Sequence, residues 1–171
     1  MAETNESALK QRPVVTVLDL LRKRIDHNDF DAVALSLDSL VVDLGYGDVR
    51  SLPGSLRWIE KLRDEGKKVA VVGASDRTSA ALELAGLDEL VDVVVCGSHV
   101  SERVVELLEA LDTEPTRVVM VSTDADELRV ASEAGIGVDI GLARGGSSPE
   151  QLRRAGADAV VADLQELLRV P

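Results

Sequence analysis

The sequence predicts an α/β protein with a doubly wound, mostly parallel sheet of about six strands and helices on both faces. Two observations lead to this prediction. Short apolar runs alternate with amphipathic stretches along most of the 171 residues, and the apolar residues are almost all aliphatic, because aromatic residues make up only 2% of the chain. Strands buried on both faces have this aliphatic composition, and strands that alternate with helices indicate βαβ units.

The apolar runs and the amphipathic stretches define each expected element. Strands are expected at 31–37, 68–73, 92–96, 117–122, 137–141 and 159–162. Helices are expected at 15–26, 54–65, 76–86, 101–111, 124–134, 148–155 and 163–169. Residues 1–14 are predicted to be a flexible tail and residues 15–171 a single domain, since a chain of this length suffices for one substantial core.

Local signals mark several helix ends. Gly66 follows the stretch 54–65 in the position of a C-cap glycine. Ser148, Pro149 and Gln151 combine a capping hydroxyl, a proline at the first helical position and a glutamine three residues after the cap, which together predict a capping box.

Four single residues have plain structural interpretations. Ser101 is predicted to be an N-cap, and so is Asp124, whose carboxylate also complements the helix dipole. Trp58 lies beside an apolar helical stripe and is predicted to be a packing residue. Cys96 lies in the apolar run of a strand and is expected in the core.

The chain carries a formal net charge of −12 at pH 7. Nucleic acids and anionic membranes attract basic surfaces, so this charge argues against both as partners. No apolar run approaches the ~20 residues of a membrane-spanning helix, and the first residues lack the basic and apolar regions of a signal peptide. A single cysteine permits no internal disulfide, and the chain is therefore expected to be cytoplasmic.

The stretch 31–44, DAVALSLDSLVVDL, joins a predicted strand to an acidic turn. Ser36, Asp38 and Ser39 lie at the carboxyl end of that strand, where open α/β sheets bind their ligands. Residues 36–43 read Ser-Leu-Asp-Ser-Leu-Val-Val-Asp. They resemble the first motif of the haloacid dehalogenase (HAD) superfamily, particularly of its β-phosphoglucomutase-like phosphatases.

In that motif the first aspartate is the nucleophile and a magnesium ligand, and the second is the general acid/base. The resemblance therefore implies that Asp38 is the retained catalytic candidate and that Ser36 stands at the nucleophile position. A serine hydroxyl does not bind magnesium as a carboxylate does, and it needs a base to become a nucleophile.

The resemblance places three further motif positions at later strand ends. Gly73 falls where the family has a phosphate-binding hydroxyl, Ser98 where it has a lysine, and Thr123 where it has a metal-binding aspartate. Glu127 takes the position of the second acid of the fourth motif. Because four positions are substituted together, the resemblance implies a degenerate catalytic site.

A serine that follows the second motif has two interpretations. Ser75 is either the N-cap of the next helix or, together with Arg77 and the backbone amides of the helix start, part of a phosphate-binding site. The sequence leaves both open.

The resemblance covers about residues 31–168, including the segment 155–164, which is similar to the end of many β-phosphoglucomutase-like proteins. Between Asp38 and Lys68 the chain has room only for a turn and one helix, so no cap domain is expected. A cap normally shields the reaction from water. Its absence would leave the carboxyl edge of the sheet open to a large partner.

The leading hypothesis is a non-catalytic HAD-like protein, a pseudoenzyme with a binding, scaffold or regulatory role, which needs no cofactor and binds a protein partner or a second copy of itself. The alternative is a cap-less, magnesium-dependent phosphohydrolase that acts on phosphate esters, with Asp38, Asp124 and Glu127 as metal ligands. A third hypothesis is a protein that binds a small phosphorylated ligand at the turn 73–77 without chemistry.

Overall fold

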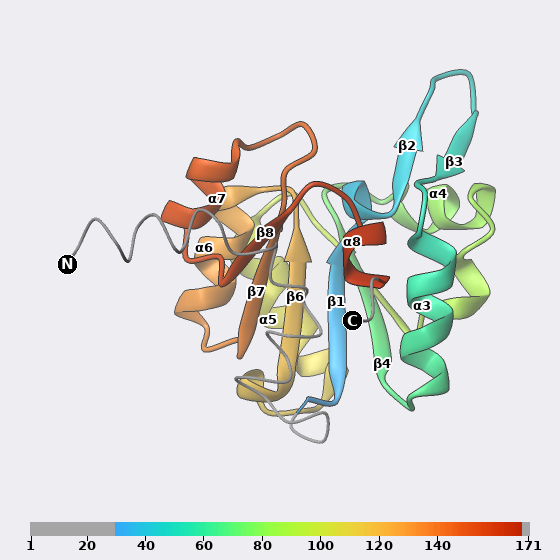
Figure 1. The fold of residues 1–171 in the computed structure, drawn as a ribbon. Coiled ribbons are helices and arrows are strands. Elements are labelled where there is room, and N and C mark those ends of the chain that lie inside the picture. Colours follow the sequence, from blue (N-terminus) through green and yellow to red (C-terminus); the bar gives the residue numbers. More distant parts are fainter. Residues whose placement is uncertain (1–29, 169–171) are drawn as a thin grey trace.

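A computed structural model describes residues 30–168 and confirms the predicted fold class (Figure 1). Six strands form one sheet in the order β5-β4-β1-β6-β7-β8, and neighbouring strands run parallel. The strands are β1 (Ala32–Ser36), β4 (Lys68–Gly73), β5 (Val93–Cys96), β6 (Val118–Ser122), β7 (Val138–Leu142) and β8 (Ala159–Val161). The predicted tail 1–14 and helix 15–26 lie outside the described residues.

The six helices predicted between residues 54 and 169 are present, with ends within about two residues of the expected ones. They are α3 (Ser55–Asp64), α4 (Thr78–Leu84), α5 (Val100–Leu111), α6 (Ala125–Glu133), α7 (Pro149–Arg154) and α8 (Gln165–Leu168). The capping box of Ser148 and Gln151 is confirmed, and so is Asp124 as the N-cap of α6. The prediction for Ser101 was wrong, because α5 begins one residue earlier and His99 is its N-cap.

Helices cover both faces of the sheet, as predicted (Figure 1). Side chains alternate along β1, so that Val33 and Leu35 pack in one cluster and Ala32 and Ala34 in another. The first cluster includes residues of α3, α4 and α8, which we call the α3 layer, and Trp58 is buried in it as predicted. The second includes residues of α5, α6 and α7, the α5 layer.

The strand order positions a ligand crevice. Chain crossovers run from β1 through β4 to β5 on one side, and from β6 through β7 to β8 on the other. Open sheets of this kind bind ligands where the strand order reverses, at the carboxyl ends of the two central strands. Here these are β1 and β6, with Leu35 paired to Val121. The residues after Ser36 and Ser122 therefore face the same crevice.

The segment between β1 and α3 differs from the prediction. A 3₁₀ turn (Leu37–Ser39) is followed by an antiparallel hairpin of β2 (Val41–Asp43) and β3 (Val49–Ser51), where only a turn had been expected. The hairpin projects from the body of the protein (Figure 1). Within residues 30–168, this hairpin and α3 are the only elements between the turn and β4, so no large cap is present there.

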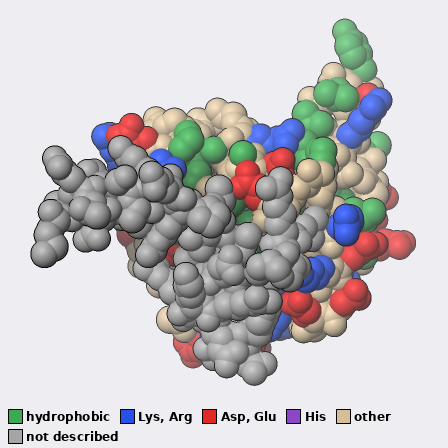
Figure 2. Space-filling model, viewed as in Figure 1, with side chains coloured by type: hydrophobic (Ala, Val, Ile, Leu, Met, Phe, Trp, Pro, Cys, Tyr) green, Lys and Arg blue, Asp and Glu red, His purple; other side chains and the backbone are tan. Residues whose placement is uncertain are grey.

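The hairpin has an unusual tip. Gly45, Tyr46 and Gly47 all have positive φ, of 87°, 54° and 77°, a conformation that the two glycines adopt without strain. The Asp43 carboxylate accepts a hydrogen bond of 2.8 Å from the Gly45 amide. Tyr46 is fully exposed and Leu44 is more than half exposed, so that the hairpin carries hydrophobic side chains to its tip (Figure 2).

Cys96 was expected in the core, and this prediction was wrong because its side chain is exposed. It lies at the end of β5, which is an edge strand of the sheet. None of the helices in residues 30–168 has both the length and the apolar character needed to cross a membrane.

Candidate active-site pocket

A pocket of about 220 Å³ lies at the carboxyl edge of the sheet, at the predicted crevice. Its walls come from the ends of β1, β4 and β6 and from the helices that follow these strands or face them. The lining residues are Ser36, Leu37, Asp38, Val72, Gly73, Ala74, Ser75, Thr78, Arg103, Thr123, Asp124 and Glu127.

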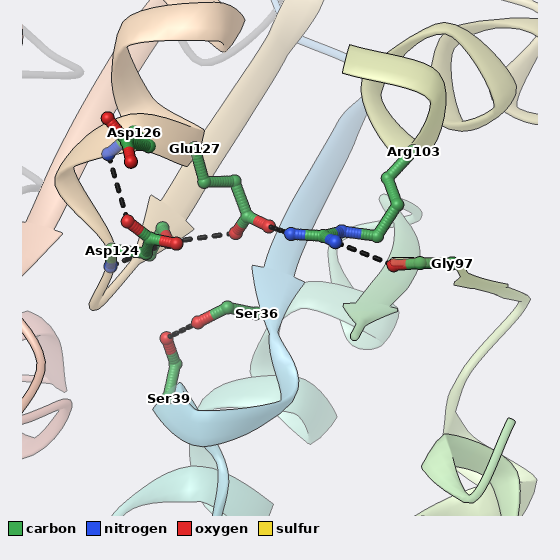
Figure 3. A network of polar contacts seen from close by, with 8 residues as sticks. Ser36, Ser39, Gly97, Arg103, Asp124, Asp126 and Glu127 are labelled. Atoms are coloured by element: carbon green, nitrogen blue, oxygen red, sulfur yellow. Dashed lines mark hydrogen bonds and ion pairs between the residues drawn. The ribbon is translucent and has the colours of Figure 1, made fainter. Parts of the chain in front are cut away.

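Ser36 and Asp38 have different environments at the end of β1. Ser36 is buried, and its hydroxyl lies 2.6 Å from the hydroxyl of Ser39, which is also buried (Figure 3). Asp38 lies in the 3₁₀ turn, and its side chain is exposed to solvent at the rim of the pocket. The position that the resemblance assigns to the nucleophile is therefore a buried hydroxyl paired with a second hydroxyl.

Thr78 fills the space beside Gly73. A Cβ atom at Gly73 would lie 1.9 Å from Thr78 Oγ1 and 2.7 Å from its Cγ2. Thr78 is fully buried, and its hydroxyl donates a hydrogen bond of 2.6 Å to the carbonyl of Ser75. Gly73 stands where the family has a phosphate-binding hydroxyl, and the side chain of Thr78 from α4 occupies the volume beside it.

This packing makes a prediction for Gly73→Ser, which would restore the hydroxyl that the resemblance assigns to that position. The new Cβ would overlap Thr78, so we expect the free energy of unfolding to fall by about 1–3 kcal/mol. Chemical denaturation measures this loss. The double variant Gly73→Ser/Thr78→Ala should recover part of it, because alanine removes Oγ1 and Cγ2 but keeps a Cβ at 2.9 Å from the new one. Equal losses in the single and double variants would contradict the packing described here.

A buried ion pair forms the wall opposite Ser36 (Figure 3). Arg103 Nη2 donates to Glu127 Oε2 at 3.1 Å, and the two side chains are only 7% and 4% exposed. Arg103 Nη1 donates to the carbonyl of Gly97 at 2.6 Å. The Ser122 hydroxyl donates to the other carboxylate oxygen of Glu127, Oε1, at 2.8 Å. Both oxygens of Glu127 are therefore held by protein donors.

The environment of Glu127 has opposing effects on its pKa. Burial raises the pKa above its ordinary value because a charged carboxylate loses its hydration. Hydrogen bonds from Ser122 and Arg103, and the positive charge of Arg103, oppose this shift. The net direction is upward, so burial outweighs the two donors.

Asp124 has a structural role beside the ion pair. Its Oδ1 accepts a hydrogen bond of 2.9 Å from the amide of Asp126, which caps the N-terminus of α6 (Figure 3). Thr123 precedes it and is buried in the pocket wall. In the part of the chain that the structure describes, no three His, Cys, Asp or Glu side chains are grouped so as to hold a metal ion.

The family resemblance implies magnesium, and the donor set does not fit this ion as it stands. Of the three proposed ligands, Asp38 lies in the exposed turn, Asp124 caps a helix, and Glu127 has both oxygens hydrogen-bonded to Ser122 and Arg103. Magnesium needs carboxylate oxygens that converge with nearly octahedral geometry. These carboxylates would have to exchange their present partners to provide it.

Other predicted site residues lie apart from the pocket. Ser98 is exposed and does not line it, and Arg77 is exposed outside it as well. Ser75 lines the pocket but does not cap α4, because Arg77 is the N-cap residue of that helix. The Ser75 hydroxyl instead accepts a hydrogen bond of 3.3 Å from the Arg77 amide.

Two residues of the site were not assigned their roles from the sequence. Arg103 is the only Lys or Arg that lines the pocket. Its position inside a predicted helix did not indicate that its side chain points into the pocket. Thr78 was one of several polar residues in the same helix. With Arg103 and the carboxylates of Asp38, Asp124 and Glu127, the lining carries one basic and three acidic groups. Such a lining favours cations over phosphate.

The fold and the position of the pocket define a doubly wound α/β domain with a ligand crevice at the carboxyl edge of its sheet, and comparison with known proteins gives its family. Residues 8–135, which are 128 of the 171 residues, match the family model described as haloacid dehalogenase-like hydrolase. The chain belongs to this family.

Two curated relatives are similar to this chain in sequence. A trehalose-phosphate phosphatase of Mycobacterium leprae is 31% identical over 150 residues, which cover 84% of this chain and 33% of the relative. A β-phosphoglucomutase of Mycobacterium bovis is 34% identical over 127 residues, covering 67% of this chain and 48% of the relative. The chain thus spans a third to a half of the length of these relatives.

Solved structures share the fold. A candidate β-phosphoglucomutase from Thermotoga maritima superposes with a TM-score of 0.71 at 18% identity, over 81% of this chain and 97% of that one. A haloacid dehalogenase-like family protein from Streptococcus pneumoniae gives 0.70 at 10% identity, over 82% and 98%. At these identities the likeness concerns the fold alone.

Proposed function

We propose that this protein is a HAD-family, phosphatase-like domain with a binding or regulatory role in place of catalysis. The observation that carries the proposal is the state of Ser36 at the nucleophile position. Its hydroxyl is buried and pairs with Ser39 at 2.6 Å. A serine becomes a nucleophile only when a base accepts its proton, and a second hydroxyl does not do so.

Two further features of the pocket support this role. Glu127, at a motif position for an acid, is neutralised by Arg103 rather than left to bind a ligand. Gly73 lacks the hydroxyl that would hold a phosphate, and Thr78 occupies its place. In both features the side chains of the pocket contact one another, so they are not available to bind a phosphate or a metal ion.

Hydrolysis of p-nitrophenyl phosphate tests the proposal. With magnesium present, the purified protein is expected to release no more nitrophenol than the buffer does, because neither an activated nucleophile nor a convergent metal site is assembled. The matched control is Asp38→Asn, which removes the retained acid. Metal-dependent hydrolysis that Asp38→Asn abolishes would overturn the proposal. A panel of sugar phosphates extends the assay to substrates of the kinds named for the relatives.

The proposed binding role includes a protein partner or a second copy of the chain, in the cytoplasm. The hairpin of β2 and β3 supports this part of the proposal. Tyr46 and Leu44 are exposed at its tip, and large apolar side chains that project from a surface favour contact with another protein.

A second candidate function is a magnesium-dependent phosphohydrolase, and the comparisons favour it. The matched family is one of hydrolases, and a curated relative is named as a phosphatase. In this case Asp38, Asp124 and Glu127 would hold the ion after Glu127 released Arg103. Calorimetric titration with magnesium separates the two candidates, because only the hydrolase requires binding by the wild-type protein.

A further inference from the structure

We infer that Arg103 takes the place of a divalent cation in this pocket, as a permanent positive charge supplied by the chain itself. The role of Arg103 rests on the proposed function, since both concern the same pocket. It adds a specific consequence: Arg103 compensates the charge of the buried Glu127 without metal, and the removal of Arg103 leaves that carboxylate free to bind a cation.

The contacts of Arg103 are those expected of a bridging cation. Its guanidinium joins the carboxylate of Glu127, on α6, to the carbonyl of Gly97, which precedes α5. Carboxylate and backbone carbonyl oxygens are also the protein ligands that hard divalent ions bind. One cationic group therefore holds oxygen atoms from two separate segments of the chain.

Burial shows that the charge is fixed in the wall and not a surface feature. The Arg103 and Glu127 side chains are 7% and 4% exposed. Arg103 Nε has no hydrogen-bond partner among the residues that the structure describes, so the guanidinium is held by its two Nη contacts. The Glu127 carboxylate offsets part of the hydration that the guanidinium has lost, and the removal of either partner would leave the other charge buried without compensation.

The charge of the lining leads to the same conclusion. Asp38, Asp124 and Glu127 face the pocket, and Arg103 is the single basic residue among its lining. Without Arg103 the pocket would contain three acids and no compensating charge. A small divalent ion could then take the place of the guanidinium beside Glu127, the one carboxylate that Arg103 holds.

The experiment compares thermal unfolding of the full chain with and without magnesium. For the wild type we expect a melting temperature that about 10 mM magnesium leaves unchanged. For Arg103→Met we expect a lower melting temperature without metal and a rise of about 3 °C at the same magnesium concentration. Arg103→Gln serves in the same way if the methionine variant does not fold.

Two matched variants identify the source of the effect. Arg103→Met/Glu127→Gln removes the freed carboxylate as well, so its melting temperature should not respond to magnesium. Arg129→Met removes an exposed arginine that pairs with Glu133 on the surface of α6, and it should behave as the wild type. Together they distinguish a pocket site from a general effect of losing a positive charge.

The outcomes are separable from those of the proposed function. A magnesium response of Arg103→Met that the Glu127→Gln change abolishes supports the role of Arg103. A response equal in the wild type and Arg103→Met, or absent from every Arg103 variant that folds, overturns it. Turnover of p-nitrophenyl phosphate by the wild type bears on the proposed function alone, because it is measured without any change at Arg103.

Discussion

Asp139→Asn is expected to raise the free energy of unfolding by on the order of 2 kcal/mol at pH 8, and by little at pH 4. Asp139 lies in β7 and is only 2% exposed. Val138 and Ile140 pack in the cluster of the α3 layer, so strand alternation turns Asp139 towards the α5 layer. The substitution keeps the shape of the side chain and removes its charge.

The neighbours of Asp139 explain why its charge is costly. Asp158, at the start of β8, accepts a hydrogen bond of 2.9 Å from the Asp139 amide, which brings a second carboxylate close. Asp139 Oδ1 has no hydrogen-bond partner among residues 30–168. Burial, and then the charge of Asp158, raise the pKa of Asp139 from 3.8 to about 7.

The sign of the pH dependence follows from this raised pKa. Between about pH 4 and pH 7 the unfolded chain has lost the Asp139 proton while the folded chain still holds it, so the free energy of unfolding falls as pH rises. Above pH 7 the loss is complete and constant. Asparagine does not ionise, so the advantage of Asp139→Asn should grow from pH 4 to pH 7 and then level off.

Urea unfolding at several pH values measures this difference. The matched control is Asp76→Asn, which neutralises an exposed aspartate in the turn before α4. A stabilisation by Asp139→Asn that is the same at pH 4 and pH 8, or that Asp76→Asn reproduces, would show that burial of Asp139 is not its cause.

Gly137→Ala is expected to lower the free energy of unfolding by about 3 kcal/mol. A Cβ atom at Gly137, just before β7, would lie 2.1 Å from the carbonyl oxygen of Thr116 and 2.9 Å from its carbonyl carbon. These are backbone atoms, so no side chain can rotate to relieve the overlap. The Gly137 amide also donates to the carbonyl of Pro115 at 3.1 Å, which holds the two segments together.

Gly97→Ala provides the control for Gly137→Ala. Its Cβ would lie 3.6 Å from Arg103 Cγ, an ordinary contact distance. We expect a change within about 1 kcal/mol, because alanine also reduces the freedom of the unfolded chain. Thermal unfolding compares the two variants directly. Equal effects would mean that the approach of Thr116 does not constrain the start of β7.

Most of the parallel sheet was predictable because its strands carry strong local signals. The run from Val118 to Val121 is apolar, since both of its faces are covered, and its short length and three valines favour a strand over a helix. The capping box at Ser148 was equally predictable, because its two hydrogen bonds join residues three apart in sequence. Short-range interactions of this kind can be predicted from one short segment of the sequence.

The remainder depends on contacts between distant segments. Arg103 reaches Glu127 across 24 positions, and Gly73 is filled by Thr78 only because α4 packs onto the end of β4. The resemblance identified Ser36, Gly73 and Thr123 as pocket positions, but it did not show which side chains from other elements pack beside them. Ser98, which the resemblance also singled out, does not line the pocket. The hairpin was not predicted because each of its two strands has only three residues. Val41 and Val42 also follow closely after the apolar run of β1, so they did not stand out as a separate strand. The burial of Cys96 was predicted wrongly because the edge strand β5 has the same apolar composition as a central strand.

The projecting hairpin and helix α3 each carry one optical reporter. The single tyrosine of the protein, Tyr46, lies in solvent at the hairpin tip, whereas its single tryptophan, Trp58, is buried in α3. The fluorescence of Trp58 will therefore report unfolding of the core. The phenol ring, open to iodination or nitration while the interior is intact, will record whether anything covers the tip.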